Sequence, residues 1–268
     1  MRSVGLSRPA VLAVASIGVH GAAAALLLVD VTWWPWAAAT LVLNHALIAA
    51  AGLCPRCNWL GPNLVRLPEA CVRRSEVALT FDDGPDPEVT PLVLDILAAH
   101  GVRATFFCIG ERAQRWPQLV QRMVAEGHRV ENHGQRHPVL AAMFMPAGWR
   151  AEVADGARTL TRLCGRPPRY YRAVAGLRNP FLQPVLRRQR LQLAGWSRRG
   201  YDTRSRDPGR VLQRLTRGLA AGDILLLHDG HAARTRTGRP VVLEVLPQLL
   251  AWLAGRGLRA VPLPEPEC

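Results

Sequence analysis

Three short polar stretches carry the side chains with which this chain could perform catalysis. They are residues 80–85 (Thr-Phe-Asp-Asp-Gly-Pro), residues 133–137 (His-Gly-Gln-Arg-His) and residues 225–229 (Leu-Leu-Leu-His-Asp). The adjacent carboxylates Asp82 and Asp83 would point to different sides of a strand end, so that one can bind a metal and the other a proton. Two histidines four residues apart would lie on one face of a helical turn and could hold one cation. The third stretch adds a titratable imidazole.

Each stretch also has an ordinary structural explanation. Asp-Gly-Pro is a common turn sequence, a pair of histidines often only makes a surface polar, and a histidine at a strand end is more often structural than catalytic. All three stretches, however, follow apolar strands of what reads as one α/β domain. We therefore favour a catalytic site around a cation, because one carboxylate and two imidazoles leave positions open for water and substrate, as catalytic zinc sites do.

The elements that must position these residues alternate between strands and helices from about Glu76 onward. The predicted strands are at 77–81, 104–109, 129–132, 193–196, 224–227 and 258–263, and the predicted helices are at 91–100, 117–126 and 241–254. Such alternation predicts a parallel sheet or a β/α barrel, in which active sites form at the carboxyl ends of the strands. The polar stretches are expected at those ends.

Two long apolar runs precede this domain. Residues 9–29 carry no charge, residues 36–53 contain few polar side chains, and Trp33, Trp34 and Trp36 cluster between the runs. Each run is long enough to cross a bilayer of about 30 Å as a helix, and the tryptophan cluster is typical of a membrane interface. We predict two transmembrane helices. A cleaved signal peptide at the first run and a buried helical hairpin are the alternatives.

Arginine positions predict the orientation of this hairpin. Arg2 and Arg8 precede the first run, the connection has no basic residue, and Arg56 and further arginines follow the second run. The positive-inside rule then places both ends and the catalytic domain in the cytoplasm, at a bacterial inner membrane. With one helix instead of two, the domain would lie on the other side. We divide the chain into a membrane segment with its linker, 1–66, and a catalytic domain, 67–268.

Composition narrows the possible partners. The 268-residue chain is 49% hydrophobic and has a net charge of +14, but its 34 basic residues are all arginine and form no run of five or more. This scatter argues against nucleic-acid binding. Of the six cysteines, Cys54 and Cys57 form one Cys-x-x-Cys pair without a second, so a structural zinc site lacks half of its ligands.

In order and spacing, the polar stretches resemble the polysaccharide deacetylase family, the NodB-homology carbohydrate esterases, over roughly residues 76–265. The resemblance implies a distorted (β/α) barrel as the fold. It implies Asp82 as the catalytic base and Asp83 as a metal ligand. It also implies His133 and His137 as the other two protein ligands of a divalent metal, with zinc as the default and cobalt, nickel or iron as alternatives.

Further residues complete the resemblance. Arg172, in Arg-Ala-Val-Ala-Gly, is implied to orient the base, the backbone N–H of Ala175 to face the oxyanion, and His228 to act as general acid. The chain departs from the family pattern at Val174, where proline is usual. It also departs in the family's Asp–Trp motif, for which Asp202 is our candidate for the carboxylate that keeps the acid protonated.

These implications predict a metal-dependent hydrolase that removes an N-acyl group from an amino sugar. Two readings of the substrate remain open: a lipid-linked amino sugar at the cytoplasmic face, which the hairpin and its arginines favour, or an extracytoplasmic polymer such as peptidoglycan or a chitin-like glycan. A third reading is an inactive sugar-binding module. Fold alone does not decide among them, but binding by itself does not require adjacent aspartates.

Overall fold

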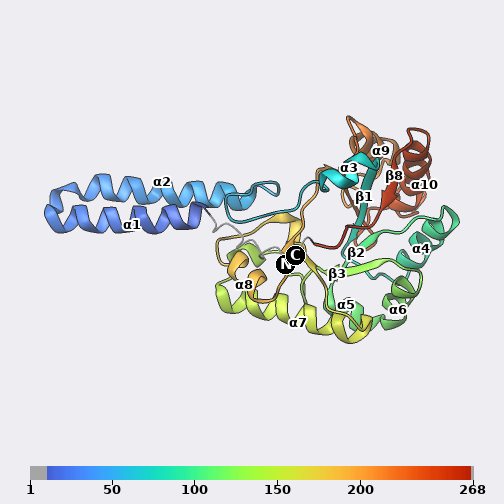
Figure 1. Cartoon of the computed structure of the whole chain (residues 1–268), viewed down its shortest axis with the longest axis horizontal. Coiled ribbons are helices and arrows are strands. Elements are labelled where there is room, and N and C mark those ends of the chain that lie inside the picture. The colour runs from blue at the N-terminus through green and yellow to red at the C-terminus, as the bar shows by residue number, and fades with distance from the viewer. Residues whose placement is uncertain (1–10, 267–268) are drawn as a thin grey trace.

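Strand β1 (Glu76–Asp82) lies at the centre of an eight-stranded parallel sheet, and all of its residues are buried. The strands run in the order β5-β4-β3-β2-β1-β7-β6, and β8 pairs with the beginning of β1. The computed structural model describes residues 11–266. Within that range β5 and β6 are not paired with each other, so the sheet forms a distorted, open half-barrel (Figure 1). The remaining strands are β2 (Thr105–Cys108), β3 (Arg129–Asn132), β4 (Tyr170–Tyr171), β5 (Gln192–Leu193), β6 (Arg198–Arg199), β7 (Ile224–His228) and β8 (Arg259–Val261).

Alternation along the strands separates an apolar outer face from an inner face that ends in polar groups. Val77, Leu79 and Phe81 of β1 pack outward in a cluster that also includes residues of the covering helices. Ala78 belongs to a separate inner cluster, and Thr80 and Asp82 follow it at the same parity. The sheet therefore brings the functional side of β1 into the half-barrel at its carboxyl end, where barrel active sites lie.

Helices cover the outside of this sheet. They are α3 (Glu69–Arg73), α4 (Thr90–Ala99), α5 (Gly110–Arg115), α6 (Pro117–Ala125), α7 (Pro146–Cys164), α8 (Leu182–Arg188), α9 (Pro208–Thr216) and α10 (Val241–Ala254), with single 3₁₀ turns η2 (Ala141–Met143) and η3 (Val174–Gly176). Helix α10 buries most of its residues against β1 and β7, as the apolar spacing of its sequence predicts.

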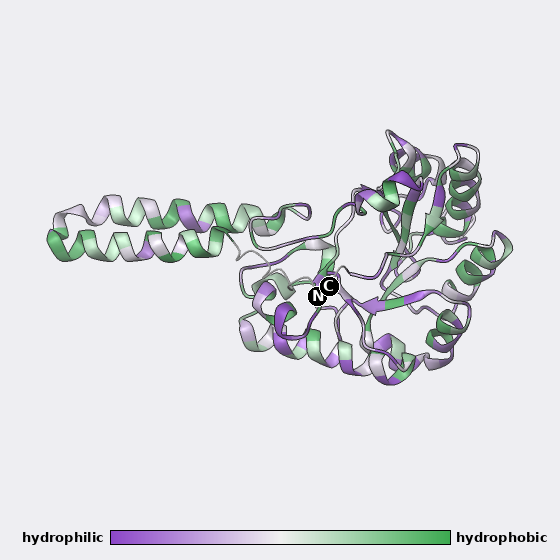
Figure 2. Ribbon diagram, in the orientation of Figure 1, coloured by the Kyte–Doolittle hydropathy of each residue, from purple (hydrophilic) through white to green (hydrophobic). Residues whose placement is uncertain are grey.

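The N-terminal helices α1 (Val11–Val29) and α2 (Trp34–Leu53) form an antiparallel hairpin that projects away from the α/β body (Figure 1). The 3₁₀ turn η1 (Val31–Trp33) joins them. Both helices are long and apolar enough to cross a membrane (Figure 2). Their side chains are mostly exposed. Asn44 donates to the Ser16 hydroxyl at 2.8 Å, which pairs the two helices through one of their few polar contacts. Length and exposure together suggest a membrane anchor or a signal sequence.

The segment between the hairpin and α3 packs against the α/β body. Leu60 is fully buried, and Leu64 pairs with Ala194 beside β5. A Cβ on Gly176 would lie 2.6 Å from Pro55, so the two loops touch closely. Arg178 donates from its backbone to Gly52 O at 3.1 Å. The part of the chain that we treated as a linker is thus tied to the catalytic body.

The fold confirms the predicted distorted α/β barrel, in the form of an open half-barrel, and the two apolar helices, with local differences. Helix α2 begins two residues before 36, because Pro35 suits the first turn of a helix. The predicted strand 193–196 is shorter, since beyond Leu193 the backbone pairs with the segment at Leu64 instead. Helices α3, α5, α7, α8 and α9 and the two-residue strands β4 and β6 were not predicted. Residues 9 and 10 of the first apolar run, and Arg2 and Arg8, lie outside the described residues.

Candidate active site

The site lies where β1 and β7 end side by side. Asp82 and His228 are register partners across these two parallel strands. Both point into the half-barrel, since each occupies the inner parity of its strand. Asp83 follows with a φ of 72°, which takes its side chain out of the alternation of β1. The two adjacent carboxylates therefore serve different neighbours, as the sequence predicts.

Asp82 is paired with a buried arginine. Arg172 Nη1 donates to Asp82 Oδ1 at 2.7 Å and to Thr80 Oγ1 at 2.8 Å. Its other nitrogens donate to the carbonyls of Ala194 and Gly195 at 3.1 and 2.9 Å. Burial lowers the pKa of Arg172, but the Asp82 charge opposes that effect. The guanidinium is thus fully buried and held in one orientation, with one oxygen of the carboxylate fixed and the other left to the cavity.

Several imidazole rings lie around the carboxylate of Asp83. Its Oδ1 lies 3.3 Å from His133 Nε2 and 3.1 Å from His137 Nε2. Burial would raise the pKa of Asp83, but hydrogen bonds from His133, His137 and His231 and the charge of His133 outweigh it and hold that pKa well below its ordinary value. His133 Nδ1 donates to the Arg172 carbonyl at 2.8 Å, which leaves Nε2 free as a ligand.

This group fits a divalent cation. The three ligand atoms lie within 4.8 Å of one another. Ligands at about 2.0–2.1 Å from a tetrahedral zinc are about 3.3 Å apart, close to the two separations measured from Asp83. One carboxylate and two imidazoles are also the donor set that zinc and similar transition metals accept.

The histidine pair is not on a helix, so that prediction was wrong. Residues 133–137 form an irregular loop after β3, in which Gly134 and His137 have φ values of 89° and 60°. Glu152 on α7 holds the loop, because its Oε1 accepts the backbone N–H groups of Arg136 and His137, each at 2.8 Å. A tertiary contact to a helix absent from the predictions therefore brings the two rings together.

His228 is paired with the carboxylate proposed for it. Asp202 Oδ1 lies 2.8 Å from His228 Nδ1, and Oδ2 accepts the backbone N–H of His228 at 2.7 Å. Both residues are buried. Burial alone would lower the pKa of His228, but attraction and hydrogen bonding to Asp202 outweigh it and raise the pKa to about 9. The imidazole is therefore protonated near neutral pH, with Nε2 left toward the site.

The stretch from Arg172 to Gly176 connects the site to the segment that follows helix α2. Ala175 has a φ of 51°, a left-handed conformation inside the turn η3. Gly176 allows a close approach, since a Cβ there would lie 2.8 Å from the Trp196 ring. Val174 is buried, in the position where the family pattern has proline. The turn is thus packed between Trp196 and the chain that leaves α2.

Two neighbours of Asp83 were missed by the sequence reasoning. His231 Nδ1 lies 3.3 Å from Asp83 Oδ2, and Arg112 donates to His231 Nε2 at 2.6 Å and to the Asp83 carbonyl at 2.9 Å. His231 comes three residues after His228, so its place in the same strand-end loop was the available signal. No feature of the local sequence indicated that Arg112, on α5, would lie beside Asp83.

Comparisons with known proteins agree with this geometry. The family model described as polysaccharide deacetylase matches residues 69–194. A chitooligosaccharide deacetylase from Bradyrhizobium sp. (strain ANU 289) is 36% identical over 196 residues, which cover 70% of this chain and 89% of the relative. A peptidoglycan-N-acetylglucosamine deacetylase from Bacillus cereus is 32% identical over 195 residues, 72% of this chain and 68% of the relative.

Solved structures show the same similarity. A crystal structure of a peptidoglycan N-acetylglucosamine deacetylase, in complex with 4-naphthalen-1-yl-N-oxidanyl-benzamide, aligns with a TM-score of 0.68 at 30% identity and covers 75% of this chain and 91% of that chain. A family 4 carbohydrate esterase from Streptomyces lividans, in complex with acetate, aligns with a TM-score of 0.62 at 30% identity, covering 69% and 91%.

Proposed function

The chain belongs to the polysaccharide deacetylase family of hydrolases that act on carbon–nitrogen bonds other than peptide bonds, and we propose that it removes acetyl groups from N-acetylglucosamine units of an oligosaccharide or of peptidoglycan. The observation that carries this proposal is the grouping at one sheet edge of an arginine-bound carboxylate, an Asp–His–His cluster and a carboxylate-bound imidazolium. Base, cation site and acid are the three parts that amide hydrolysis needs.

Asp82 is proposed as the base. Its Oδ1 is paired with Arg172, which holds the carboxylate in one orientation. Its Oδ2 lies 3.8 Å from His133 Nε2, on the side of the cation site. From there it can take the proton of a water molecule whose oxygen attacks the acetyl carbon.

Asp83, His133 and His137 are proposed to hold the divalent cation. When bound there, a zinc-like cation lowers the pKa of water and polarises the amide carbonyl. The part of this chain is to present the three ligand atoms together and to keep them oriented. His133 is fixed by the Arg172 carbonyl and His137 by the loop that Glu152 holds. Zinc is our default, and cobalt, nickel and iron suit the same ligands.

His228 is proposed as the acid. An amine is a poor leaving group unless protonated, so the C–N bond breaks as the imidazolium gives its proton to nitrogen, and acetate and a free amino sugar result. Asp202 keeps the imidazole charged before that step. The backbone N–H of Ala175 is our candidate donor to the developing oxyanion, because η3 begins two residues after Arg172, which contacts both Asp82 and His133.

The hairpin supports a second candidate substrate, a lipid-linked amino sugar. Helices α1 and α2 would hold the catalytic domain, proposed as residues 67–268, at a membrane surface, and both ends of the hairpin are proposed to be cytoplasmic. The relatives are deacetylases of chitooligosaccharides and of peptidoglycan, which favours a glycan or oligosaccharide over the lipid-linked amino sugar. An inactive sugar-binding module is least favoured, because the base, acid and metal ligands are all present.

Acetate release tests the proposal directly. We expect the purified full chain to release acetate from chitooligosaccharides when loaded with zinc and to stop after removal of the metal with a chelator. Readdition of metal should restore turnover. Equal turnover by the chelated protein would exclude the metal-dependent mechanism, and release only from a lipid-linked amino sugar would favour the second candidate.

A further inference from the structure

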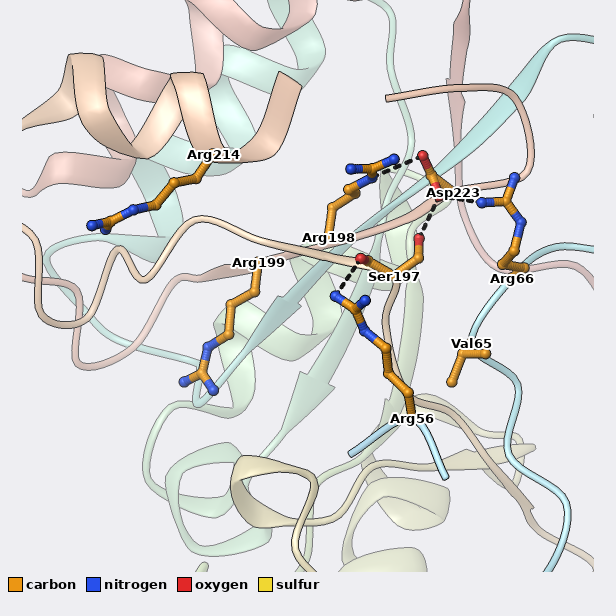
Figure 3. A pocket seen from close by; sticks show the side chains of 8 residues that line it. All are labelled: Arg56, Val65, Arg66, Ser197, Arg198, Arg199, Arg214 and Asp223. Carbon is orange, nitrogen blue, oxygen red and sulfur yellow. Dashed lines mark hydrogen bonds and ion pairs between the residues drawn. The ribbon is translucent and has the colours of Figure 1, made fainter. Parts of the chain in front are cut away.

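A cavity of about 360 Å³ lies between the chain that leaves α2 and the edge strand β6, and none of the candidate catalytic or metal-binding residues lines it (Figure 3). The charged residues that line it come from separate parts of the sequence: Arg56, Arg66, Arg198, Arg199, Arg214 and Asp223. In sequence these arginines belong to a scatter without any long basic run. Folding places five guanidinium groups around one space that contains a single carboxylate.

Asp223 neutralises only part of this charge. Its carboxylate is buried and forms ion pairs with Arg66 (Nη1–Oδ1, 2.6 Å) and with Arg198 (Nε–Oδ2, 3.0 Å), so two of the arginines share one carboxylate. In residues 11–266, the other three have no carboxylate within ion-pair distance. Arg56 donates to the Ser197 carbonyl at 2.6 Å, and Arg214 makes one long contact to the Gly200 carbonyl at 3.5 Å. The cavity therefore keeps a net positive charge.

Arg199 is ordered without being neutralised. Its guanidinium lies 5.5 Å from the centre of the Trp196 ring and 5.0 Å from that of Tyr201, so aromatic faces hold it. Its Nε is buried and has no hydrogen-bond partner in the described part of the chain. The two rings thus orient a cation that no carboxylate neutralises in the described part of the chain, and such a cation favours an anionic acceptor at its remaining donors.

The position of the cavity suggests which anion. Arg56 comes three residues after Leu53, where α2 ends, and Arg66 follows on the same segment. If α2 spans a bilayer, this segment emerges at the level of the lipid headgroups. Guanidinium groups bind phosphate oxygens in a bidentate manner, and acidic headgroups attract basic segments next to a membrane helix.

A second arginine-lined cavity serves as comparison. It is larger, about 1030 Å³, and is lined by four further arginines and by Arg214, which it shares with the first cavity; Asp207 and Glu244 line it as well, and no residue of the segment after α2 does. Arg210 in that cavity is paired with Asp207 at 3.3 Å. Abundance of arginine alone therefore does not produce the combination of uncompensated charge and membrane-proximal position.

We propose that the cavity lined by Arg56, Arg199 and Arg214 binds the phosphate group of an acidic phospholipid at the surface of the membrane that contains α1 and α2. The proposal rests on the membrane placement of the hairpin and is independent of the hydrolytic reaction. Bound lipid would hold the α/β body against the bilayer through a contact that the hairpin does not supply.

Thermal unfolding of the full chain in uncharged maltoside micelles tests this inference. Dioctanoyl phosphatidylglycerol, dioctanoyl phosphatidylcholine and inorganic phosphate are titrated separately, and the rise in the unfolding midpoint reports binding to the folded state. We expect saturable stabilisation by phosphatidylglycerol and none by phosphatidylcholine. Arg56→Gln and Arg199→Gln should each raise the apparent Kd about ten-fold or more, because each removes a charge-assisted hydrogen bond.

Arg256→Gln is the matched control. Arg256 lies 3.8 Å from the centre of the Trp252 ring at the end of α10, so its loss removes the same charge and a similar stacking contact outside the cavity. Its titration should match that of the unaltered chain. Comparing each variant with its own lipid-free midpoint separates lost binding from lost stability.

The outcomes are distinct. Stabilisation by phosphatidylglycerol that survives in both cavity variants, or that is absent in the unaltered chain, overturns the proposal. Equal stabilisation by inorganic phosphate at equal concentration, with no added effect of lipid, assigns the cavity to free phosphate and overturns the lipid. Flotation with pure phosphatidylcholine vesicles tests the hairpin separately, since neutral lipid does not engage the cavity. Failure there rejects the membrane placement.

Discussion

The carboxyl edge of the sheet and the α1–α2 hairpin use polar groups in opposite ways. At the edge, Asp82 and His228 each have a buried ionic partner from another element. In the hairpin, an Asn44–Ser16 hydrogen bond is one of few polar contacts, and most apolar side chains are exposed. The carboxyl edge of the sheet can serve as an active site because fixed partners orient its charged side chains. The hairpin is a candidate membrane anchor because it carries almost no charged side chains.

The first prediction removes the cation site. His133→Ala or His137→Ala should abolish bound metal and acetate release together, because each deletes one of three protein ligands. Metal content by atomic absorption and turnover are measured on the same sample. His100→Ala, an exposed histidine at the end of α4, is the control and should change neither quantity. Retained metal in both ligand variants would show that the cation binds elsewhere.

The second prediction separates the two carboxylates. Asp82→Asn should keep the metal but lower kcat by about 10²–10⁴, the usual contribution of one proton-transfer group. Asp83→Asn should instead lower the affinity for the metal, because Asp83 contacts both histidines. Titration of the metal-free variants with zinc distinguishes the two effects. If Asp82→Asn lost the metal more readily than Asp83→Asn, the assigned roles would be reversed.

The third prediction concerns pH. The pKa of His228 is raised to about 9, so the acid is protonated at neutral pH and is lost as pH rises through that value. The profile of kcat/KM should be bell-shaped, with an alkaline limb near that pKa. Asp202→Asn removes the charge that opposes burial, so the limb should move to lower pH, and His228→Ala should flatten it. A limb unchanged in both variants would assign it to another group.

The same pair affects stability with a defined sign. Since folding raises the pKa of His228 above its ordinary value of about 6.5, the ion pair stabilises the fold below that pH and loses its contribution as pH rises through about 9. Unfolding midpoints of the unaltered chain and Asp202→Asn should therefore differ most at acidic to neutral pH and converge above pH about 9.

The fourth prediction has the smallest effect on chemistry. Deleting residues 1–53 should leave turnover of a soluble chitooligosaccharide unchanged, because the hairpin supplies no group to the site. Deleting residues 1–66 should lower the free energy of unfolding by about 2–5 kcal/mol or more, the cost of losing one buried leucine, since Leu60 is buried in the body. Urea unfolding and acetate release are measured on both truncations. Equal stability would show that the segment is only a linker.

Local sequence was sufficient to predict the position of those side chains that depend on a single stretch of the chain. Asp82, Asp83 and His228 directly follow or end apolar strands, and strand alternation together with the end of pairing sets their direction. The apolar runs of the hairpin were likewise readable, because length and lack of charge are local properties. The His133–His137 spacing predicted that the two histidines lie together, as they do, but it predicted the wrong backbone, because Glu152 accepts hydrogen bonds from a loop with positive φ at Gly134 and His137.

Only tertiary structure decided the partners. Arg112 and His231 beside Asp83, and Glu152 behind the histidine loop, come from elements far apart in sequence. The same holds for the arginine-lined cavity, whose charges arrive from the segment after α2, from β6 and from α9. Side-chain type and spacing report what a residue can do. Long-range packing determines which charged groups meet in a low-dielectric interior, and no single stretch of the sequence specifies that packing.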